Sequence, residues 1–248
     1  MKLQTLGTGS ILTSALSACS IVDDRILIDV PNGAMKAARR AKLTPSELDA
    51  CLITHFHADH YFDVVFLLLE QGLRNVRSSE FLLAGPPELE QRVESLFSLA
   101  YPESWAKVKE NSRVRFYELP PEGGQFTVPG YKITAVPVKH RTPVAFGYIV
   151  SDSDAAVGFS GDTEVCDGLS DILRNVSTAV VDASFLTGRS GHMGVDEVLA
   201  LKEKFPSVNL ITTHMTDDVR DKQWPGLTVP SDGSCFKVSG HELTAWSN

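Results

Sequence analysis

Three histidines and an aspartate stand within six residues of one another: His55, His57, Asp59 and His60. They follow the apolar stretch 51–53, which predicts a short buried strand, so the cluster is expected at the end of that strand, where the sites of α/β proteins collect. Imidazole nitrogen and carboxylate oxygen are ligands that zinc, iron and manganese accept. The run is internal and spaced, which excludes an expression tag. An accidental surface cluster is a weaker interpretation, because four ligand-type side chains share one short segment.

The pattern His55-x-His57-x-Asp59-His60 resembles the signature of the metallo-β-lactamase superfamily. This resemblance implies three further ligands, each placed after an apolar strand further along the chain. His140 follows the predicted strand 131–138, Asp162 follows 155–160 and His214 follows 208–213. Taken alone, each of these side chains would be interpreted as a core histidine or a turn residue. Because they occur in the expected order, the resemblance covers nearly the whole chain.

The resemblance implies two divalent metal ions per chain. The first would be held by His55, His57 and His140 and the second by Asp59, His60 and His214, with Asp162 as the bridge. Zinc is the expected metal, although iron and manganese accept the same ligands. Two ions about 3.5–4 Å apart can share a hydroxide that attacks the substrate. Asp29 matches an acidic position of the family, and we expect it to support the site rather than to bind metal.

His192 distinguishes between branches of this family. It lies in the segment 190–194, 22 positions before His214, and resembles the histidine of the phosphodiesterase branch. That resemblance implies that His192 stabilises or protonates the leaving oxygen, while Asp59 orients the hydroxide. The alternative is a histidine on a flexible loop before a helix. Arg141 either contacts a substrate phosphate or is a charge at the rim, and His241 is expected at the surface.

These features predict a binuclear metal-dependent hydrolase, a phosphodiesterase that cleaves a small (cyclic) phosphate diester with a metal-bound hydroxide. A second hypothesis is an RNA endonuclease similar to ribonuclease Z. Those enzymes carry a long arm between the third metal histidine and the bridging aspartate, whereas here this interval, from His140 to Asp162, is only 22 positions. A small cyclic-phosphate phosphodiesterase is closer in length, but it has a cysteine-rich zinc site near the N-terminus, where this chain has only Cys19. A lactonase or thioesterase-type hydrolase would direct the same hydroxide at a carbonyl carbon, and an inactive metal-binding scaffold would hold the ions without turnover.

Composition limits the class of protein and its partners. The chain has 248 residues, of which 43% are hydrophobic and 22% charged, and its formal net charge is −8. These values are typical of a globular protein, here expected to be a single domain over 1–248. The acidic balance argues against a broad electrostatic grip on folded RNA. The four widely spaced cysteines and the absence of a long apolar stretch favour a cytoplasmic protein without a membrane partner. A homodimer is expected from the resemblance alone.

Helix and strand patterns alternate in both halves of the chain, and strands cluster in the centre. This distribution favours sheets sandwiched between helices over a doubly wound parallel sheet. The resemblance specifies an α+β fold, the four-layer αβ/βα sandwich of the metallo-β-lactamases. Helices are expected over 34–41, 61–74, 88–100 and 195–205, with a helix start at 44–47. The segment Gln71–Tyr117 carries no motif that indicates its role, and we expect it to shape specificity.

Overall fold

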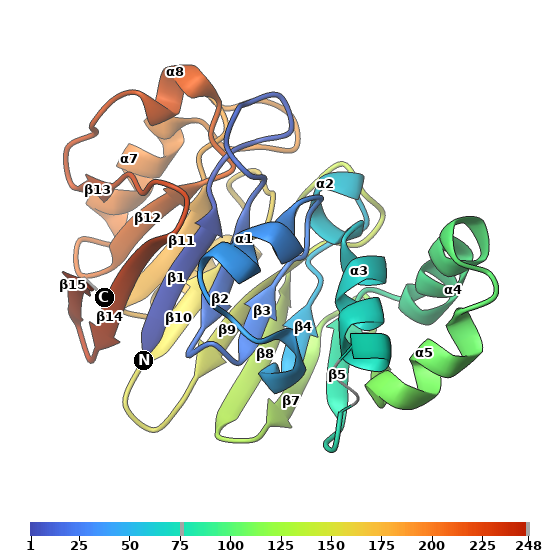
Figure 1. Cartoon of the computed structure of the whole chain (residues 1–248). Helices are drawn as coiled ribbons and strands as arrows, with labels where there is room; N and C mark the ends of the chain where they lie inside the picture. Colours follow the sequence, from blue (N-terminus) through green and yellow to red (C-terminus); the bar gives the residue numbers. More distant parts are fainter. Residues whose placement is uncertain (75–76, 247–248) are drawn as a thin grey trace.

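The protein is built from two mixed β-sheets that pack face to face, with helices on both outer faces (Figure 1). The structure is a computed structural model that describes residues 1–74 and 77–246. It confirms the expected α+β, four-layer sandwich. The first sheet has the order β15 (Glu242–Ala245), β14 (Ser234–Ser239), β1 (Lys2–Gly7), β2 (Cys19–Val22), β3 (Ile26–Ile28), β4 (Ala50–Leu52), β5 (Phe81–Gly85) and β6 (Val114–Glu118). The second has the order β13 (Leu227–Thr228), β12 (Asn209–Thr213), β11 (Thr178–Asp182), β10 (Ala156–Phe159), β9 (Phe146–Ser151), β8 (Tyr131–Pro137) and β7 (Gly124–Val128).

Helices complete the outer layers. The outer face of the first sheet carries helices from the N-terminal half, namely α1 (Ala34–Arg40), α2 (Ala58–Tyr61), α3 (Val64–Leu69), α4 (Leu89–Ala100) and α5 (Trp105–Ser112), with the short turns η1 (Pro45–Glu47) and η2 (Glu70–Arg74). The second sheet is accompanied by α6 (Asp167–Arg174), α7 (Val195–Lys204) and α8 (Asp217–Arg220). None of the helices within the described residues is both long and apolar enough to cross a bilayer.

Alternation along the strands divides the buried side chains between layers. In β3, Ile26 and Ile28 enter the core between the two sheets, whereas Leu27 packs outward under the helices. In β12, Ile211 faces the central core and Leu210 faces the outer layer. This is the two-residue period of a strand, and it makes both faces of each sheet apolar. The sequence therefore specifies helices on both sides.

The predicted helix over 61–74 is wrong in its bounds. Helical structure begins earlier, at Ala58, and is interrupted at Asp63, so that α2, α3 and η2 replace one continuous helix. The backbone amide of Asp63 donates to the Val30 carbonyl, and its carboxylate accepts the amides of Gly33 and Met35. These bonds to the start of α1 compete with a continuous helical ladder and turn the chain at this position.

Two further expectations differ from the structure. The helix start at 44–47 forms only the single turn η1, and Thr44 makes no side-chain cap. Helix α5 was not predicted, because its sequence is mostly polar and only Val108 and Ser112 are buried. Its backbone packs so closely on η2 that a Cβ at Gly72 would lie 2.8 Å from the Val108 carbonyl oxygen. A close approach of two backbone segments produces no periodic pattern of hydrophobic residues, so the sequence does not indicate this helix.

We expect Phe146→Ala to lower the free energy of unfolding by about 3–5 kcal/mol, because Phe146 is fully buried between the sheets and the substitution leaves a cavity there. Urea unfolding of the metal-free protein measures the loss. Phe66→Ala is the matched control, since it removes the same atoms from a side chain that is 49% exposed. Equal losses in the two variants would contradict the assignment of Phe146 to the central core.

Candidate metal centre

The two sheets deliver the predicted ligands to one edge of the sandwich. Strands β8, β10, β11 and β12 run in the same direction, because β9 is antiparallel to both β8 and β10 while β10, β11 and β12 are mutually parallel. Their carboxyl ends therefore meet at one edge, where His140, Asp162 and His214 follow. The first sheet contributes the segment 55–60, which follows β4.

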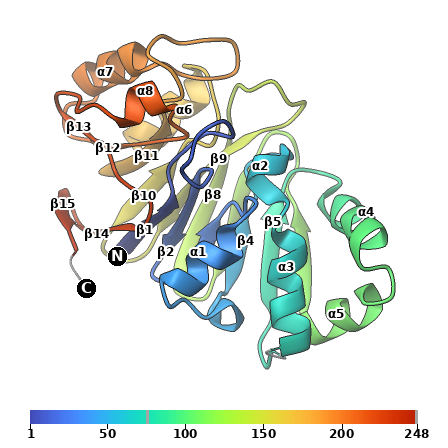
Figure 2. The same ribbon diagram turned by 45° about the horizontal axis from the view of Figure 1, so that its top comes forward.

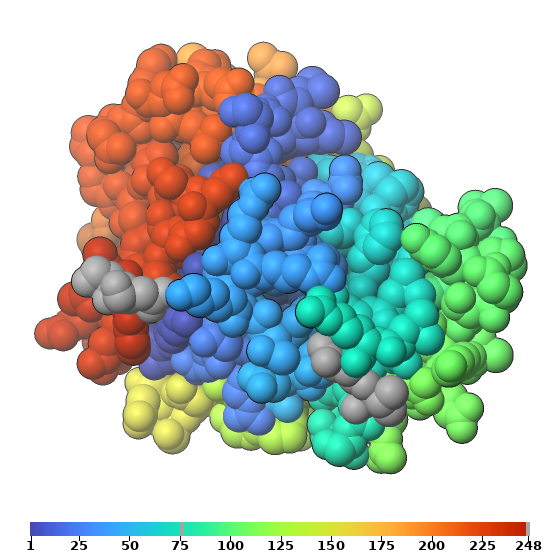
Figure 3. Space-filling model, in the orientation of Figure 1, coloured from blue at the N-terminus to red at the C-terminus, as the bar shows by residue number. Residues whose placement is uncertain are grey.

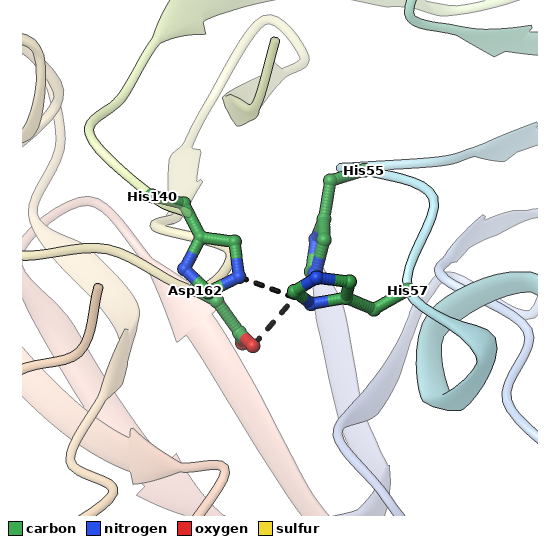
Figure 4. Close-up of side chains that lie close together, drawn as sticks. All are labelled: His55, His57, His140 and Asp162. Carbon is green, nitrogen blue, oxygen red and sulfur yellow. Dashed lines mark hydrogen bonds and ion pairs between the residues drawn. The ribbon is translucent and has the colours of Figure 1, made fainter. Parts of the chain in front are cut away.

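The first group of ligand atoms comes from both sheets. One ligand atom each of His55, His57, His140 and Asp162 lies within 4.8 Å of the others. Figure 4 shows these side chains converging from opposite sides on one small volume. His57 Nδ1 and His140 Nε2 are 3.1 Å apart, and Asp162 Oδ2 is 3.9 Å from His55 Nε2.

The second group lies directly beside the first and shares its carboxylate. Asp59, His60 and His214 also bring ligand atoms within 4.8 Å of one another. Asp162 Oδ2 is 3.2 Å from His60 Nε2 and 3.3 Å from His214 Nε2. Asp162 thus faces both groups, which is the geometry that a bridging ligand requires.

Contacts behind the rings fix which nitrogen faces the centre. The hydroxyl of Thr54 donates its proton to Asp29, and the hydroxyl of Ser184 donates its proton to Asp182. Because each hydroxyl has only one proton, it must accept the hydrogen bond from the imidazole nitrogen beside it. The Nδ1 atoms of His55, His60, His140 and His214 therefore point away from the centre and their Nε2 atoms point into it, as in established metal sites, whereas His57 presents its Nδ1 to the centre. The Nδ1 contacts are His55 with Thr54 (3.0 Å), His60 with Asp29 (2.8 Å), His140 with the Gly191 carbonyl (2.7 Å) and His214 with Ser184 (2.8 Å).

Two site residues adopt a left-handed backbone conformation that non-glycine residues rarely take. Asp29 has φ 60° and His214 has φ 57°. Asp29 is buried and accepts hydrogen bonds from the Thr54 amide, the Thr54 hydroxyl and His60 Nδ1, each at 2.8 Å. Such local strain persists where surrounding contacts impose it, which is typical of functional sites. Asp29 thereby holds His60, the supporting role expected of it.

The donor set fits a divalent metal ion. The Nε2 atoms of His55, His60 and His214 are buried and have no hydrogen-bond partner among the described residues. Leaving a buried polar atom unsatisfied costs about 1–3 kcal/mol each. A cation bound between these nitrogens and the carboxylates of Asp59 and Asp162 would satisfy all three.

The electrostatics of the centre favour positive charge. Burial raises the pKa of Asp162, but His214 and His60 outweigh it and hold that pKa well below its usual range. Burial lowers the pKa of His60, yet Asp162 and Asp29 raise it well above its ordinary value. Burial and the neighbouring His60 keep the pKa of His55 well below its usual value, which favours the neutral imidazole that metal binding requires. A metal ion would take the place of the proton on His60.

His192 lies beside this cluster, and its Nδ1 contacts Asp182 more closely than it contacts Asp162. Its Nδ1 is 3.0 Å from Asp182 Oδ2, but 3.8 Å from Asp162 Oδ2. Asp182 is fully buried at the end of β11 and also accepts the amides of Thr163 and Ser184. Asp182 therefore fixes the His192 ring, which is 19% exposed and stacks on His214 at 5.1 Å between centroids.

Arg141 and His241 lie outside the ligand cluster. Arg141 is exposed and its side chain packs on the turn that carries His192, since a Cβ at Gly191 would lie 2.5 Å from Arg141 Cγ. His241 is exposed in the turn between β14 and β15.

Sequence reasoning missed Asp182, Ser184 and Thr54, which lie behind the ligands. Asp182 carried a usable signal, because it ends an apolar strand in the same way as the residues before Asp162 and His214. The hydroxyls of Ser184 and Thr54 accept hydrogen bonds from histidines, and this role leaves no recognisable pattern in the sequence.

Comparison with known proteins agrees with this architecture. The family model described as "Beta-lactamase superfamily domain" matches residues 24–215. The chain is 22% identical to a ribonuclease Z of Pyrococcus abyssi, over 96% of each chain. Two cyanobacterial proteins of the same name match, and the chain spans about half of their length. Among solved structures, the short form of human tRNase Z has a TM-score of 0.77 at 18% identity, covering 96% of this chain and 99% of that one. A diphosphatase of the PhnP family has a TM-score of 0.74 at 19% identity, covering 96% and 98%.

We expect zinc to raise the melting temperature of the metal-free protein by about 5 °C or more, because the ion binds a site that exists only in the folded chain. His57→Ala should reduce this shift and the zinc content after dialysis, since it removes a half-buried ligand without opening a large cavity. Circular dichroism and elemental analysis measure both quantities. His241→Ala is the matched control. An unchanged shift in His57→Ala would contradict the proposed ligand set.

Proposed function

Since the chain belongs to the beta-lactamase superfamily, we propose that it is a metal-dependent hydrolase that cleaves a small phosphate diester. The observation that carries the proposal is the His192–Asp182 pair beside the side chains that could hold metal. His192 Nδ1 lies 3.0 Å from Asp182 Oδ2 and 3.8 Å from Asp162 Oδ2, and His192 also forms a third such group with Asp162 and His214. The similar proteins described above are named ribonuclease Z, tRNase Z and diphosphatase, names that support phosphate chemistry.

We propose that two divalent ions, zinc by preference, occupy the centre. His55, His57 and His140 would hold one, Asp59, His60 and His214 the other, and Asp162 would contact both. When bound, such ions activate water and neutralise charge on phosphate oxygens. The sharing of Asp162 Oδ2 between the two groups supports the pair.

Asp59 orients the attacking water. It lies at the open side of the centre, with its Oδ2 3.5 Å from His214 Nε2. Burial raises its pKa, but the contacts with His214 and His60 hold that pKa below its usual value. Asp59 therefore remains an ionised acceptor that aligns a water molecule toward phosphorus.

His192 donates the proton that the leaving oxygen needs. The Nδ1–H group bonds to Asp182 and orients the ring. The donor is therefore the imidazolium form of His192, which also carries a proton on Nε2 and becomes the neutral Nδ1–H form when it gives that proton to the leaving oxygen. Arg141 beside the same turn is the proposed contact for a non-bridging phosphate oxygen, because a guanidinium matches phosphate geometry.

Two features support a small substrate. The interval between His140 and Asp162 is occupied by β9 and β10, which reverse direction in a tight turn at 152–155 closed by the Asp152 carboxylate. No arm projects from this segment. The net charge of −8 also disfavours a large polyanion. RNA is the second candidate substrate, favoured by the relatives named ribonuclease Z.

The zinc-loaded protein should hydrolyse bis(p-nitrophenyl) phosphate and cyclic phosphates, and act at least about tenfold more slowly on lactones and thioesters of similar size. Side-by-side measurement of kcat/KM tests this order. A transfer-RNA precursor in the same panel decides between a small diester and RNA. Faster turnover of carbonyl esters would overturn the proposed reaction.

His192→Ala should lower kcat for diesters by about 100-fold with metal content unchanged, because the leaving oxygen loses its proton donor. The loss should be larger for an alkyl leaving group than for p-nitrophenolate, which needs less protonation. Asp182→Asn, which keeps the size of the side chain but replaces one of the two accepting oxygens, should show the same leaving-group dependence with a smaller loss. Equal losses for both leaving groups would remove His192 from proton transfer.

A further inference from the structure

A cleft of about 1230 Å³ opens beside Asp59, outside the ligand cluster. Its walls are α1, the segment 58–66 that forms α2 and the start of α3, and the loop 10–17 between β1 and β2. Figure 2 shows α1, α2 and the loop between β1 and β2 near one another, and Figure 3 views the same face with the dark blue loop above the lighter blue α1. A single phosphate would fill a small part of this volume, since sites for drug-sized ligands span roughly 300–1,000 Å³.

One wall of the cleft is aromatic and continues from the metal centre. Asp59, Phe62 and Phe66 follow one another at helical spacing, and all three line the cleft. The two phenylalanine side chains are 45% and 49% exposed. Exposed rings beside a reactive centre offer a stacking surface for a planar group of the substrate.

The facing wall carries two cations. Lys36 and Arg40 lie one turn apart on α1, and both line the cleft. Within residues 1–74 and 77–246 neither forms an ion pair, whereas the adjacent Arg39 pairs with Glu70 on the other side of the helix. The cleft therefore offers two positive charges at some distance from the metals.

The carboxylates that line the cleft away from Asp59 are already occupied. Asp63 accepts the amides of Gly33 and Met35 at 3.0 and 3.1 Å, which pins α1. Asp232 likewise accepts hydrogen bonds from the Leu16 amide, at 2.8 Å, and from the amide and hydroxyl of Thr8. These bonds hold the loop 10–17 in place. Both walls are thereby preformed. The Asp63 carboxylate attracts the charge of Lys36 but forms no ion pair with it among the described residues, so Lys36 and Arg40 remain the groups that can bind an external anion.

We propose that this cleft is a second anion site that selects diesters with a charged tail. One ester group of the substrate would stack a planar ring on Phe62 and Phe66 and place a second phosphate on Lys36 and Arg40. This inference rests on the proposed phosphodiesterase function and names the substrate class: a diester whose one arm carries an aromatic ring and a terminal phosphate. A second copy of the chain is the competing occupant, and it would have to supply anionic partners for the two cations.

Thymidylyl-(3′→5′)-thymidine with and without a 5′-phosphate tests the proposal. The zinc-loaded protein should prefer the phosphorylated form in kcat/KM by about fivefold or more, the range of a charge-assisted contact at a half-exposed site. Lys36→Ala/Arg40→Ala should abolish this preference while retaining turnover of the unphosphorylated form. Lys107→Ala/Lys132→Ala removes the same net charge from exposed positions outside the cleft and is the matched control. Equal preference in both double variants would overturn the inference.

Binding gives a readout that does not depend on turnover. Calorimetric titration with thymidine 3′,5′-bisphosphate should show about fivefold weaker binding to Lys36→Ala/Arg40→Ala than to the control variant. Phe62→Leu/Phe66→Leu, which retains apolar bulk, should weaken binding of the same probe through lost stacking. If no diester is hydrolysed, the proposed function fails, and the titration still decides on the anion site. If the phenylalanine variant changes the sedimentation mass and leaves binding intact, the face is a contact between copies and the inference fails.

Discussion

A single buried carboxylate organises the centre: Asp162 Oδ2 lies within 3.9 Å of Nε2 atoms from His55, His60 and His214. Three buried imidazole nitrogens face this one carboxylate, while the Nδ1 atoms of the same rings contact Thr54, Asp29 and Ser184 behind them. The fold thus maintains a pocket that a cation completes. The surrounding core must offset that cost, and it holds these side chains on strand ends and at the start of α2.

The site also depends on how closely the two sheets approach at this edge. The Tyr148 hydroxyl donates to the Ile53 carbonyl at 2.8 Å, and the Phe146 amide donates to the Thr54 carbonyl at 3.0 Å. Gly161 lies at the same contact between the two sheets and has φ 59°. A Cβ at this position would lie 2.8 Å from the Phe146 carbonyl oxygen. These bonds carry the 55–60 segment of one sheet to the strand ends of the other. A glycine immediately before Asp162 is therefore a steric requirement of the bridge.

The sequence predicted the parts of the protein that follow local rules. The distribution of helix and strand patterns favoured sheets sandwiched between helices, and the resemblance to the metallo-β-lactamases specified the four-layer fold. The same resemblance implied that His140 and His214 join the 55–60 segment. What the sequence could not predict depends on distant partners. The helix expected over 61–74 is broken at Asp63 because amides some 30 positions earlier compete for that residue. Asp182 and Ser184 gain their roles only from rings that arrive from other strands.

The break at Asp63 also couples the cleft to the metal centre. The Val30 amide donates to the His60 carbonyl at 2.7 Å, and the Asp63 amide returns to the Val30 carbonyl at 3.0 Å, so the segment before α1 is bound to the ligand segment. The Asp63 carboxylate then fixes the start of α1, and with it the direction in which Lys36 and Arg40 point. An overall charge of −8 repels extended polyanions, whereas two cations on a helix anchored beside His60 attract one additional phosphate. In the proposed function, net charge and local charge would therefore select different features of a substrate: the first would limit its size, and the second would specify where its remaining charge must lie.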